Sequence, residues 1–353
     1  MNLSFQKACS LFVHFLFIFF AGLSFARPGQ SELASDLQPQ KGFIKLSDKV
    51  ERYVEYSQQK NDKPLVVMVN GLVYDVDRWA DLRQRLQLAG YSTLNYYFRG
   101  QLLTLKKEKQ TFGQPLFFKS GLEGKDFAEE LHGLLGQLKV DKPVVVLGLS
   151  YGASIAAEFA QRYPAQIEQL IIMSPLVKSL DKYTSEGQWL SWNLDAIAMW
   201  WGPFWGPAVY DAAYKLIYQS YLSSRVVPER VPSMFADDAE TYKQSLFYLI
   251  RATRKFDLTE YDFSALKDNK VHYLLAKEDD NRVFQDQVTA FKRVAPVSQG
   301  ALIWLSESEH AIPDSQPAQA ASYISYLLNK DSRIKYGQTY KADSEGLKLW
   351  QPK

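Results

Sequence analysis

The sequence predicts an α/β fold: a mostly parallel, doubly wound sheet with helices on both faces and a helical cap inserted after one strand. Short apolar runs alternate along the chain with segments whose apolar residues recur at helical spacing. Most residues of these runs are apolar, which is typical of parallel strands buried on both faces. Ligands of such sheets bind beyond the carboxyl ends of the strands, so residues that follow strands are the first functional candidates.

The alternation begins at residue 65, after a short helix expected at Lys49–Gln58. The expected strands are Leu65–Val69, Tyr91–Phe98, Val144–Leu147, Gln169–Met173, Val271–Ala276 and Ala301–Leu305. The expected helices are Arg78–Leu88, Asp126–Leu138, Ser154–Arg162, Asp286–Val294 and Gln316–Leu328. The predicted core therefore spans residues 64–176 and 263–330, with a lead-in at 27–63 and a polar tail at 331–353.

Residues 177–262 interrupt this alternation and are dense in large aromatic side chains. The interval is predicted to form a helical cap, with breaks at Gly202-Pro203 and Gly206-Pro207. Its aromatic residues could pack the cap, line a pocket for an acyl chain or aromatic group, or face a membrane or lipid surface. The candidates for substrate contact are Trp189, Trp192, Trp200, Trp201 and Trp205.

The first 26 residues are predicted to be a signal peptide. An apolar run at Leu11–Phe20 follows the single charge of Lys7, and small residues stand at Ser24 and Ala26. This spacing predicts cleavage after Ala26, with an uncleaved anchor as the alternative. In either case the chain is expected to be exported, to the periplasm or the extracellular space.

Composition excludes several classes of function. The chain carries 41 basic and 39 acidic residues, a net charge of +2, so no strong field would attract nucleic acid. Its one cysteine, Cys9, lies in the signal segment, so the mature chain would have no disulfide, cysteine nucleophile or thiolate metal site. No metal or organic cofactor is expected, and the oligomeric state is left open.

The turn at 148–152, Gly-Leu-Ser-Tyr-Gly, is the strongest functional signal. It joins an apolar strand directly to the helix that follows. Glycines two positions before and after Ser150 suit a tight turn that holds the serine hydroxyl out beyond the strand. The amides at the start of the helix point to the same place and favour an oxyanion. Ser150 is therefore the predicted nucleophile.

A serine nucleophile needs a base, and the chain has only four histidines. His14 lies in the signal segment, His132 lies within a predicted helix, and His272 lies within an apolar strand. His310 follows the strand Ala301–Leu305, in a loop on the same rim as Ser150. His310 is the predicted base.

The carboxylate that orients the base is expected in the acidic loop after the strand Val271–Ala276. This loop offers Glu278, Asp279 and Asp280. Asp279 is favoured, Asp280 is the close alternative, and Glu278 ranks last. A solvated turn would explain the remaining acids.

The oxyanion hole needs two backbone amides. One is expected from Tyr151, directly after the serine. The other is expected from the loop after the first strand, with Leu72 as the best candidate. Asn70-Gly71 could also be an ordinary turn pair, but the strand before it and the helix after it argue against a hairpin.

From about Pro64 to Leu328 the chain resembles the α/β-hydrolase fold family. The likeness is strongest from Leu138 through the serine turn to Pro175, and it covers the order Ser150, Asp279, His310. Three residues depart from frequent family patterns. Asn70 stands where histidine is common before glycine, Leu149 stands where histidine often precedes the serine, and Arg99-Gly100-Gln101 lacks the His-Gly tail of Arg-Gly-His-Gly.

These observations predict an exported serine hydrolase that cleaves a carboxylic ester, of esterase or lipase type, acting on a small-molecule acyl substrate. Aminopeptidase, amide or thioester chemistry is the alternative within the same fold. An aminopeptidase would need an acidic cap residue, for which Asp195, Asp211 and Asp237 are available. The alternative of another class is a catalytically silent binding protein with this fold.

Overall fold

A computed structural model describes residues 38–72, 74–178, 239–253, 256–266, 271–277, 279, 281–298 and 300–351. The chain divides into two units, Met1–Gln38 and Pro39–Lys353, and all elements below belong to the second. Among the described residues, no helix is long and apolar enough to span a membrane. The predicted signal peptide lies outside the described residues and stays a prediction.

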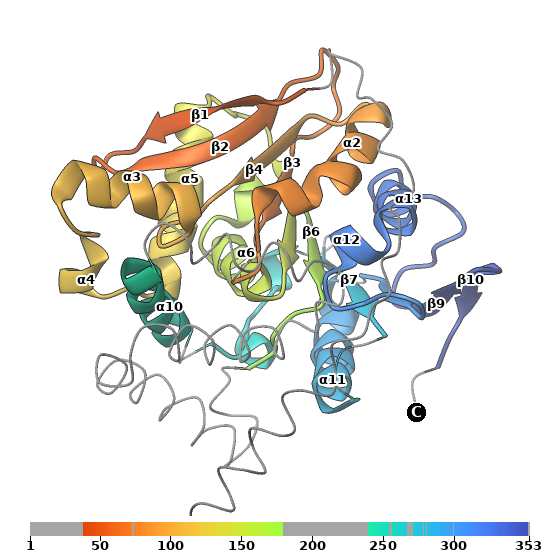
Figure 1. The fold of residues 1–353 in the computed structure, drawn as a ribbon. Helices are drawn as coiled ribbons and strands as arrows, with labels where there is room; N and C mark the ends of the chain where they lie inside the picture. Colours follow the sequence, from red (N-terminus) through yellow and green to blue (C-terminus); the bar gives the residue numbers. More distant parts are fainter. Residues whose placement is uncertain are drawn as a thin grey trace, which may run out of the picture. The chain divides into compact units, whose positions relative to one another are not determined.

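A ten-stranded sheet forms the centre of the second unit (Figure 1). Its spatial order is β1-β2-β4-β3-β5-β6-β7-β8-β9-β10. The seven neighbouring strands from β4 to β9 are parallel, and β1, β2 and β10 pair antiparallel. The strands are β1 (Gln40–Lys45), β2 (Glu51–Ser57), β3 (Val66–Val69), β4 (Thr93–Tyr96), β5 (Val144–Leu149), β6 (Ile167–Met173), β7 (Val271–Ala276), β8 (Leu302–Leu305), β9 (Thr339–Asp343) and β10 (Gly346–Leu349).

Helices cover both faces of this sheet. The described α-helices are α2 (Ala80–Leu88), α3 (Leu102–Phe112), α4 (Phe117–Ser120), α5 (Gly124–Gln137), α6 (Tyr151–Arg162), α10 (Ala239–Ala252), α11 (Asn281–Ser298), α12 (Ile312–Ser315) and α13 (Pro317–Leu328). Short 3₁₀ helices are η2 (Val76–Trp79), η3 (Pro164–Gln166), η5 (Leu258–Glu260) and η6 (Ser264–Leu266). The parallel arrangement confirms the predicted doubly wound α/β sheet.

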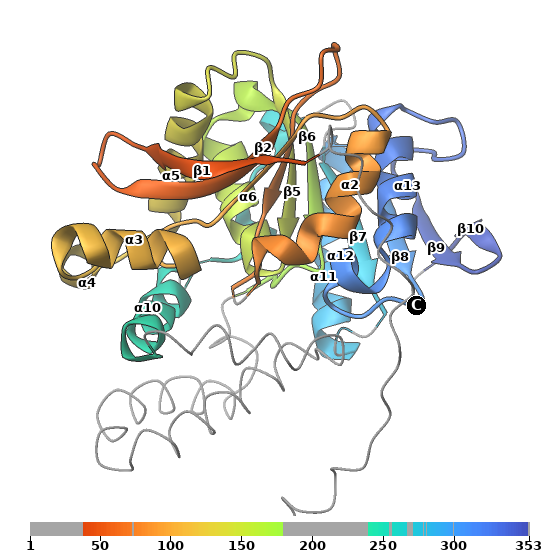
Figure 2. The ribbon, with the colours of Figure 1, turned by 45° about the horizontal axis from the view of Figure 1, so that its top comes forward.

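Two apolar clusters, one on each face, hold the layers together. Leu82 of α2 and Ile324 of α13 belong to one cluster, and these two helices pack side by side (Figure 2). Leu131 of α5, Ile155 of α6 and Phe291 of α11 belong to the other cluster. Alternate residues of β5 join the two clusters, which explains why this strand is apolar throughout.

The predicted helix at Lys49–Gln58 is wrong, because the segment is strand β2. The segment is rich in polar residues, yet the Arg52 and Glu55 side chains are buried. Arg52 pairs with Glu130 of α5 and Glu55 pairs with Arg83 of α2. The sheet therefore begins inside the predicted lead-in.

The predicted polar tail also belongs to the sheet. Tyr340 and Ala342 of β9 are buried, while Thr339, Lys341 and Asp343 are partly exposed. This alternation has a period of two, as expected for a strand with one buried face. β9 and β10 thus extend the core beyond the predicted boundary at residue 330.

Only part of the predicted cap is described, namely 177–178, 239–253 and 256–262. It includes helix α10, whose Ser245 and Leu249 are buried. The five candidate tryptophans lie outside the described residues, and so does Asp280. Their predicted roles stay predictions.

Candidate functional site

Ser150 lies between β5 and α6 in a backbone conformation that non-glycine residues rarely adopt. Its φ is 54° and its ψ is −112°. The turn is held on both sides, because the Ser150 amide donates to Met173 O (2.9 Å) and the Ala153 amide donates to Ser150 O (3.0 Å). A strained residue that the fold holds so firmly is a marker of functional sites.

The two glycines of this turn, Gly148 and Gly152, leave no room for a side chain. A Cβ at Gly148 would lie 2.6 Å from Gly152 O and 2.7 Å from Ala153 Cα. A Cβ at Gly152 would lie 2.3 Å from Val69 O and 2.5 Å from Asn70 O. These clashes are with backbone, which cannot move aside cheaply. Glycine at both positions is therefore needed for the close passage of β5, α6 and the loop after β3.

The loop after β3 lies against the serine turn. A Cβ built on Gly71 would be 3.7 Å from Ser150 Cβ. Leu72 follows in the same loop, and Tyr151 is the first residue of α6. The first amides of a helix have no intrahelical acceptor, so the Tyr151 amide is suited to bind an anion. Both predicted oxyanion donors thus come from segments adjoining Ser150, and their role stays a prediction.

Asp279 and His310 are joined by a hydrogen bond. The two atoms, His310 Nδ1 and Asp279 Oδ1, are 2.5 Å apart. Asp279 follows β7 and His310 follows β8, so both lie at the carboxyl edge of the parallel strands, as does Ser150 after β5. The Asp279 side chain is 2% exposed and the His310 side chain is 19% exposed. Such a carboxylate can fix the tautomer and orientation of the imidazole ring.

The environment raises the pKa of His310 above its ordinary value of 6.5. Burial is the largest influence and lowers the pKa, because it penalises the charged ring. The negative charge of Asp279 and its hydrogen bond outweigh burial and raise it, while the positive charge of Arg78 lowers it. His310 is thus a stronger base than a free histidine.

The other two described histidines have structural surroundings. His272 of β7 is fully buried, and its Nδ1 accepts a hydrogen bond from the Ala301 amide (3.1 Å). His132 of α5 stacks on Tyr163, with ring centroids 4.2 Å apart. These contacts give His132 and His272 structural roles, and the choice of His310 as the base stays a prediction.

Sequence reasoning missed Gln287, whose side chain binds the Asp279 carboxylate. This side chain on α11 is fully buried. Its Nε2 donates to Asp279 Oδ2 (2.9 Å) and to Pro175 O (2.8 Å). A glutamine within a predicted helix gives no sign of this role in the sequence.

Sequence reasoning also missed Asp314, which connects the segment after β3 with helix α12, directly after His310. Asp314 of α12 accepts hydrogen bonds from Tyr74 Oη (2.9 Å) and Arg78 Nε (2.7 Å). The Arg78 guanidinium also lies 4.3 Å from the centre of the Tyr74 ring. The Arg78 and Asp314 side chains are only 7% and 10% exposed, so this ion pair is largely shielded from solvent.

Together these contacts place a strained serine, an aspartate–histidine pair and a loop of backbone amides at one edge of the sheet. This arrangement has the parts that acyl transfer to a serine requires. Within the described ranges, no group of three or more His, Cys, Asp or Glu side chains could hold a metal ion.

Comparison with known proteins gives one family match and many similar structures. Residues 60–231 match the family model described as serine aminopeptidase, S33. No curated protein matches the sequence.

Solved structures resemble the chain over most of its length. A lipase candidate from Acinetobacter baumannii matches with 14% identity and a TM-score of 0.62, over 95% of this chain and 99% of the other. An esterase from Exiguobacterium antarcticum matches with 16% identity and a TM-score of 0.58, over 82% and 99%. A bromoperoxidase from Bacillus anthracis matches with 15% identity and a TM-score of 0.63, over 82% and 100%. At such identities the likeness concerns the fold.

Proposed function

The chain has the α/β-hydrolase fold, as its sequence predicts, and we propose that it is an exported serine hydrolase that cleaves a carboxylic ester through an acyl-enzyme on Ser150. The observation that carries this proposal is the Asp279–His310 hydrogen bond at the strand edge where the strained Ser150 lies. The comparisons support a hydrolase, because the family model and several similar structures carry hydrolase descriptions.

In the proposed mechanism, His310 takes the proton of the Ser150 hydroxyl as the Ser150 oxygen attacks the acyl carbon. Asp279 holds the imidazole through Nδ1 and stabilises its cationic form. The amides of Leu72 and Tyr151 stabilise the oxyanion of the tetrahedral intermediate. His310 then gives the proton to the departing alcohol. Water, activated by the same ring, attacks the acyl-enzyme and releases the acid.

Labelling with a fluorophosphonate probe tests the nucleophile. We expect the purified protein to be labelled and the Ser150→Ala variant to be unlabelled. Ser154→Ala is the matched control, since Ser154 is a buried serine of α6, the helix that follows Ser150, and its hydroxyl donates to Tyr151 O. Labelling that survives Ser150→Ala would contradict the proposal.

Amide hydrolysis is a second candidate, favoured by the description of the matching family model. Hydrolysis of p-nitrophenyl esters of increasing acyl length, compared with aminoacyl p-nitroanilides, separates the two. An esterase should cleave the esters with much the higher kcat/KM, and a dependence on acyl length would support an apolar pocket. Preference for anilides with a free amine would establish the aminopeptidase instead.

Export is a separate part of the proposal and rests on the first 26 residues. Expression of the full chain, followed by cell fractionation and amino-terminal sequencing, tests it. We expect the exported protein to begin at Arg27. A full-length protein in the membrane fraction would instead support the uncleaved anchor.

A further inference from the structure

Gln101 contacts three consecutive residues of the loop after β3. Its Nε2 donates to Gly71 O (2.7 Å) and to Leu72 O (3.2 Å), and its Oε1 accepts from Asn70 Nδ2 (3.3 Å). The residue is 1% exposed and precedes α3. One buried side chain thus fixes the path of the loop that adjoins Ser150.

These bonds determine where the loop amides point. In a planar trans peptide, the carbonyl of one residue and the amide of the next point in opposite directions. Holding Gly71 O toward Gln101 therefore turns the Leu72 N–H away from Gln101. Loops without such an anchor could rotate this peptide at little cost.

We propose that Gln101 is a positioning residue of the oxyanion hole, which sets the direction of the Leu72 amide by binding the carbonyls of Gly71 and Leu72. This inference rests on the proposed function, because it concerns the oxyanion of the same reaction. Gln101 itself would not touch the substrate; it would act through the loop.

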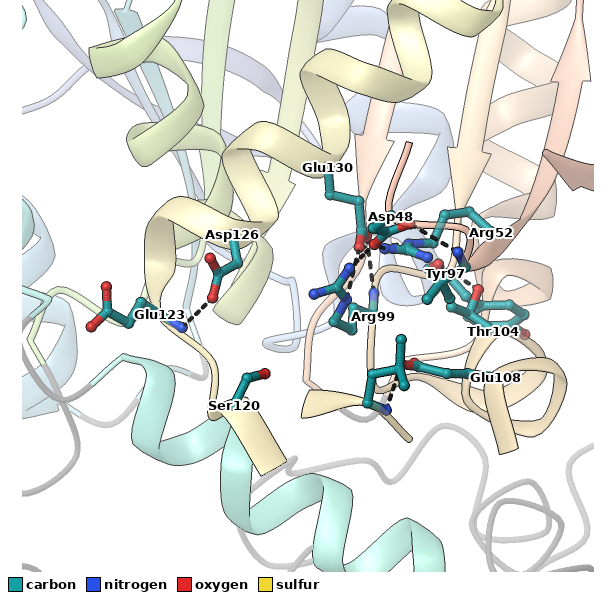
Figure 3. A network of polar contacts seen from close by, with 12 residues as sticks. Asp48, Arg52, Tyr97, Arg99, Thr104, Glu108, Ser120, Glu123, Asp126 and Glu130 are labelled. Carbon is teal, nitrogen blue, oxygen red and sulfur yellow. Dashed lines mark hydrogen bonds and ion pairs between the residues drawn. The ribbon is translucent and has the colours of Figure 1, made fainter. Parts of the chain in front are cut away.

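The backbone around Gln101 is fixed by a charge network in which Arg52 and Glu130 are buried and Asp48 and Arg99 are partly exposed; Figure 3 shows it in part. Glu130 of α5 accepts from the Arg99 amide (2.9 Å) and from Arg52 Nε (2.6 Å). Asp48 accepts in turn from Arg52 Nη2 (2.7 Å) and from the Arg99 guanidinium. The segment that carries Gln101 is therefore anchored two residues before it.

Further contacts hold the same segment. The backbone N–H of Gln101 donates to Phe98 O (3.0 Å), and Ser245 of α10 donates through Oγ to Gly100 O (2.7 Å). Gly100 has a φ of 88°, and a Cβ there would lie 2.8 Å from Ser245 Oγ. A glutamine that starts from such a fixed backbone can hold the loop accurately.

Asn70, the first residue of this loop, is held by contacts of its own. Its Oδ1 accepts from Trp79 Nε1 (2.8 Å) and from Asn95 Nδ2 (3.1 Å), and its Nδ2 donates to Tyr96 O (3.1 Å). Asn70 and Gln101 are two of the positions at which the chain departs from frequent family patterns. Because they bond each other, the two departures form one structural unit.

The substitution Gln101→Met tests the proposal, since methionine has similar length and lacks the amide donor. We expect kcat for a p-nitrophenyl ester to fall about 10- to 100-fold while KM stays within about threefold, a loss below that of removing an oxyanion donor outright. The inhibition constant of a trifluoromethyl ketone, which forms a tetrahedral adduct, should rise by the same factor as kcat/KM falls. A merely structural role would not produce this proportion.

Gln87→Met is the matched control. Gln87 is also a buried glutamine, but it binds Thr93 Oγ1 (3.0 Å) at the amino end of β4, the opposite edge of the sheet. The Gln87→Met variant should lose thermal stability without a comparable loss of kcat.

Gln101→Glu serves as a second variant if Gln101→Met does not fold. It keeps the acceptor for Asn70 and replaces the donor by a second carboxylate oxygen, so its kcat should also fall.

The outcomes separate this inference from the proposed function. If folded Gln101 variants keep kcat within about twofold of the unaltered protein, or lose kcat without weaker binding of the ketone, Gln101 has no positioning role. If the unaltered protein neither hydrolyses esters or amides nor reacts with fluorophosphonate, the proposed function fails and the inference falls with it.

Discussion

The side-chain amide of Gln287 donates a hydrogen bond to the Asp279 carboxylate, with 2.9 Å between Nε2 and Oδ2. The other oxygen of this carboxylate lies 2.5 Å from His310 Nδ1. Asp279 is therefore held from both sides, by a helix and by the histidine it orients. Because Gln287 also binds Pro175 O, the orientation of the acid depends on the segment after β6 as well.

We expect Gln287→Leu to lower kcat about tenfold, because the carboxylate would lose the donor that fixes its plane. Ester hydrolysis would measure this fall in kcat, and thermal unfolding of the same preparation would show whether the variant is folded. Gln169→Leu is the control, as Gln169 is a buried glutamine of β6 whose side chain contacts Leu327 O, away from the acid. Equal kcat values for the two variants would count against a role of Gln287 in orienting Asp279.

The acid can be identified by comparing Asp279→Asn with Asp280→Asn. We expect Asp279→Asn to lower kcat by about 10⁴-fold, because an amide would favour the wrong tautomer of His310. Asp280→Asn should keep most of the activity. The assignment of Asp279 is wrong if both variants remain active or if only Asp280→Asn is impaired.

The residual activity of Asp279→Asn should also show a shifted pH dependence. His310 must be neutral to act as a base, so the raised pKa places the acid limb of kcat/KM above the ordinary value of 6.5 in the unaltered protein. Without the charge of Asp279, burial and Arg78 both lower the pKa. The acid limb should therefore move to lower pH, and a limb that stays in place or rises would contradict this account of the pKa.

The raised pKa of His310 has a consequence for stability. A group whose pKa is higher in the folded chain stabilises it most at pH below the unfolded value, and this stabilisation is lost as pH rises through the folded pKa. The melting temperature of His310→Gln relative to the unaltered protein should thus be lowest at pH below about 6.5 and recover as the pH rises above that value. A difference that does not change with pH would argue against the charge pairing with Asp279.

The elements that sequence reasoning predicted best are those with one dominant physical cause. Val271–Ala276 is apolar except for His272 and forms a fully buried strand over the same residues. The serine turn was predictable because any side chain at its two glycine positions would clash with the backbone. β2 was not predictable in this way, because the buried charges of Arg52 and Glu55 pair with Glu130 and Arg83, which lie far away in the sequence.

The same distinction explains what was found and missed at the site. Asp279 and His310 could be chosen from their places after strands and from the scarcity of histidine. Gln287, Gln101 and Asp314 act through hydrogen bonds to groups between 8 and 240 residues away along the chain. No periodicity or spacing marks such contacts, so only the folded structure reveals them.

Gly152 and Gly71 form a matched pair for testing the backbone argument. A Cβ at Gly152 would meet Val69 O at 2.3 Å, whereas at Gly71 the nearest atom would be Tyr74 Cβ at 3.5 Å, an ordinary contact. We expect Gly152→Ala to unfold at a clearly lower temperature or to fail to fold, and Gly71→Ala to keep nearly normal stability. Similar melting temperatures would mean that the backbone near Ser150 can yield more easily than its contacts indicate.

The Arg78–Asp314 ion pair offers a test of how the segment that follows His310 is stabilised. Asp314→Leu leaves the largely buried Arg78 without its carboxylate, and breaking such a pair costs about 3–5 kcal/mol of unfolding free energy. The double variant Arg78→Met/Asp314→Leu removes both charges and should regain much of that stability in denaturant unfolding. Because the charge of Arg78 lowers the pKa of His310, Arg78→Met alone should move the acid limb of kcat/KM to higher pH. A limb that moves to lower pH would show that Arg78 does not act on His310 through its charge.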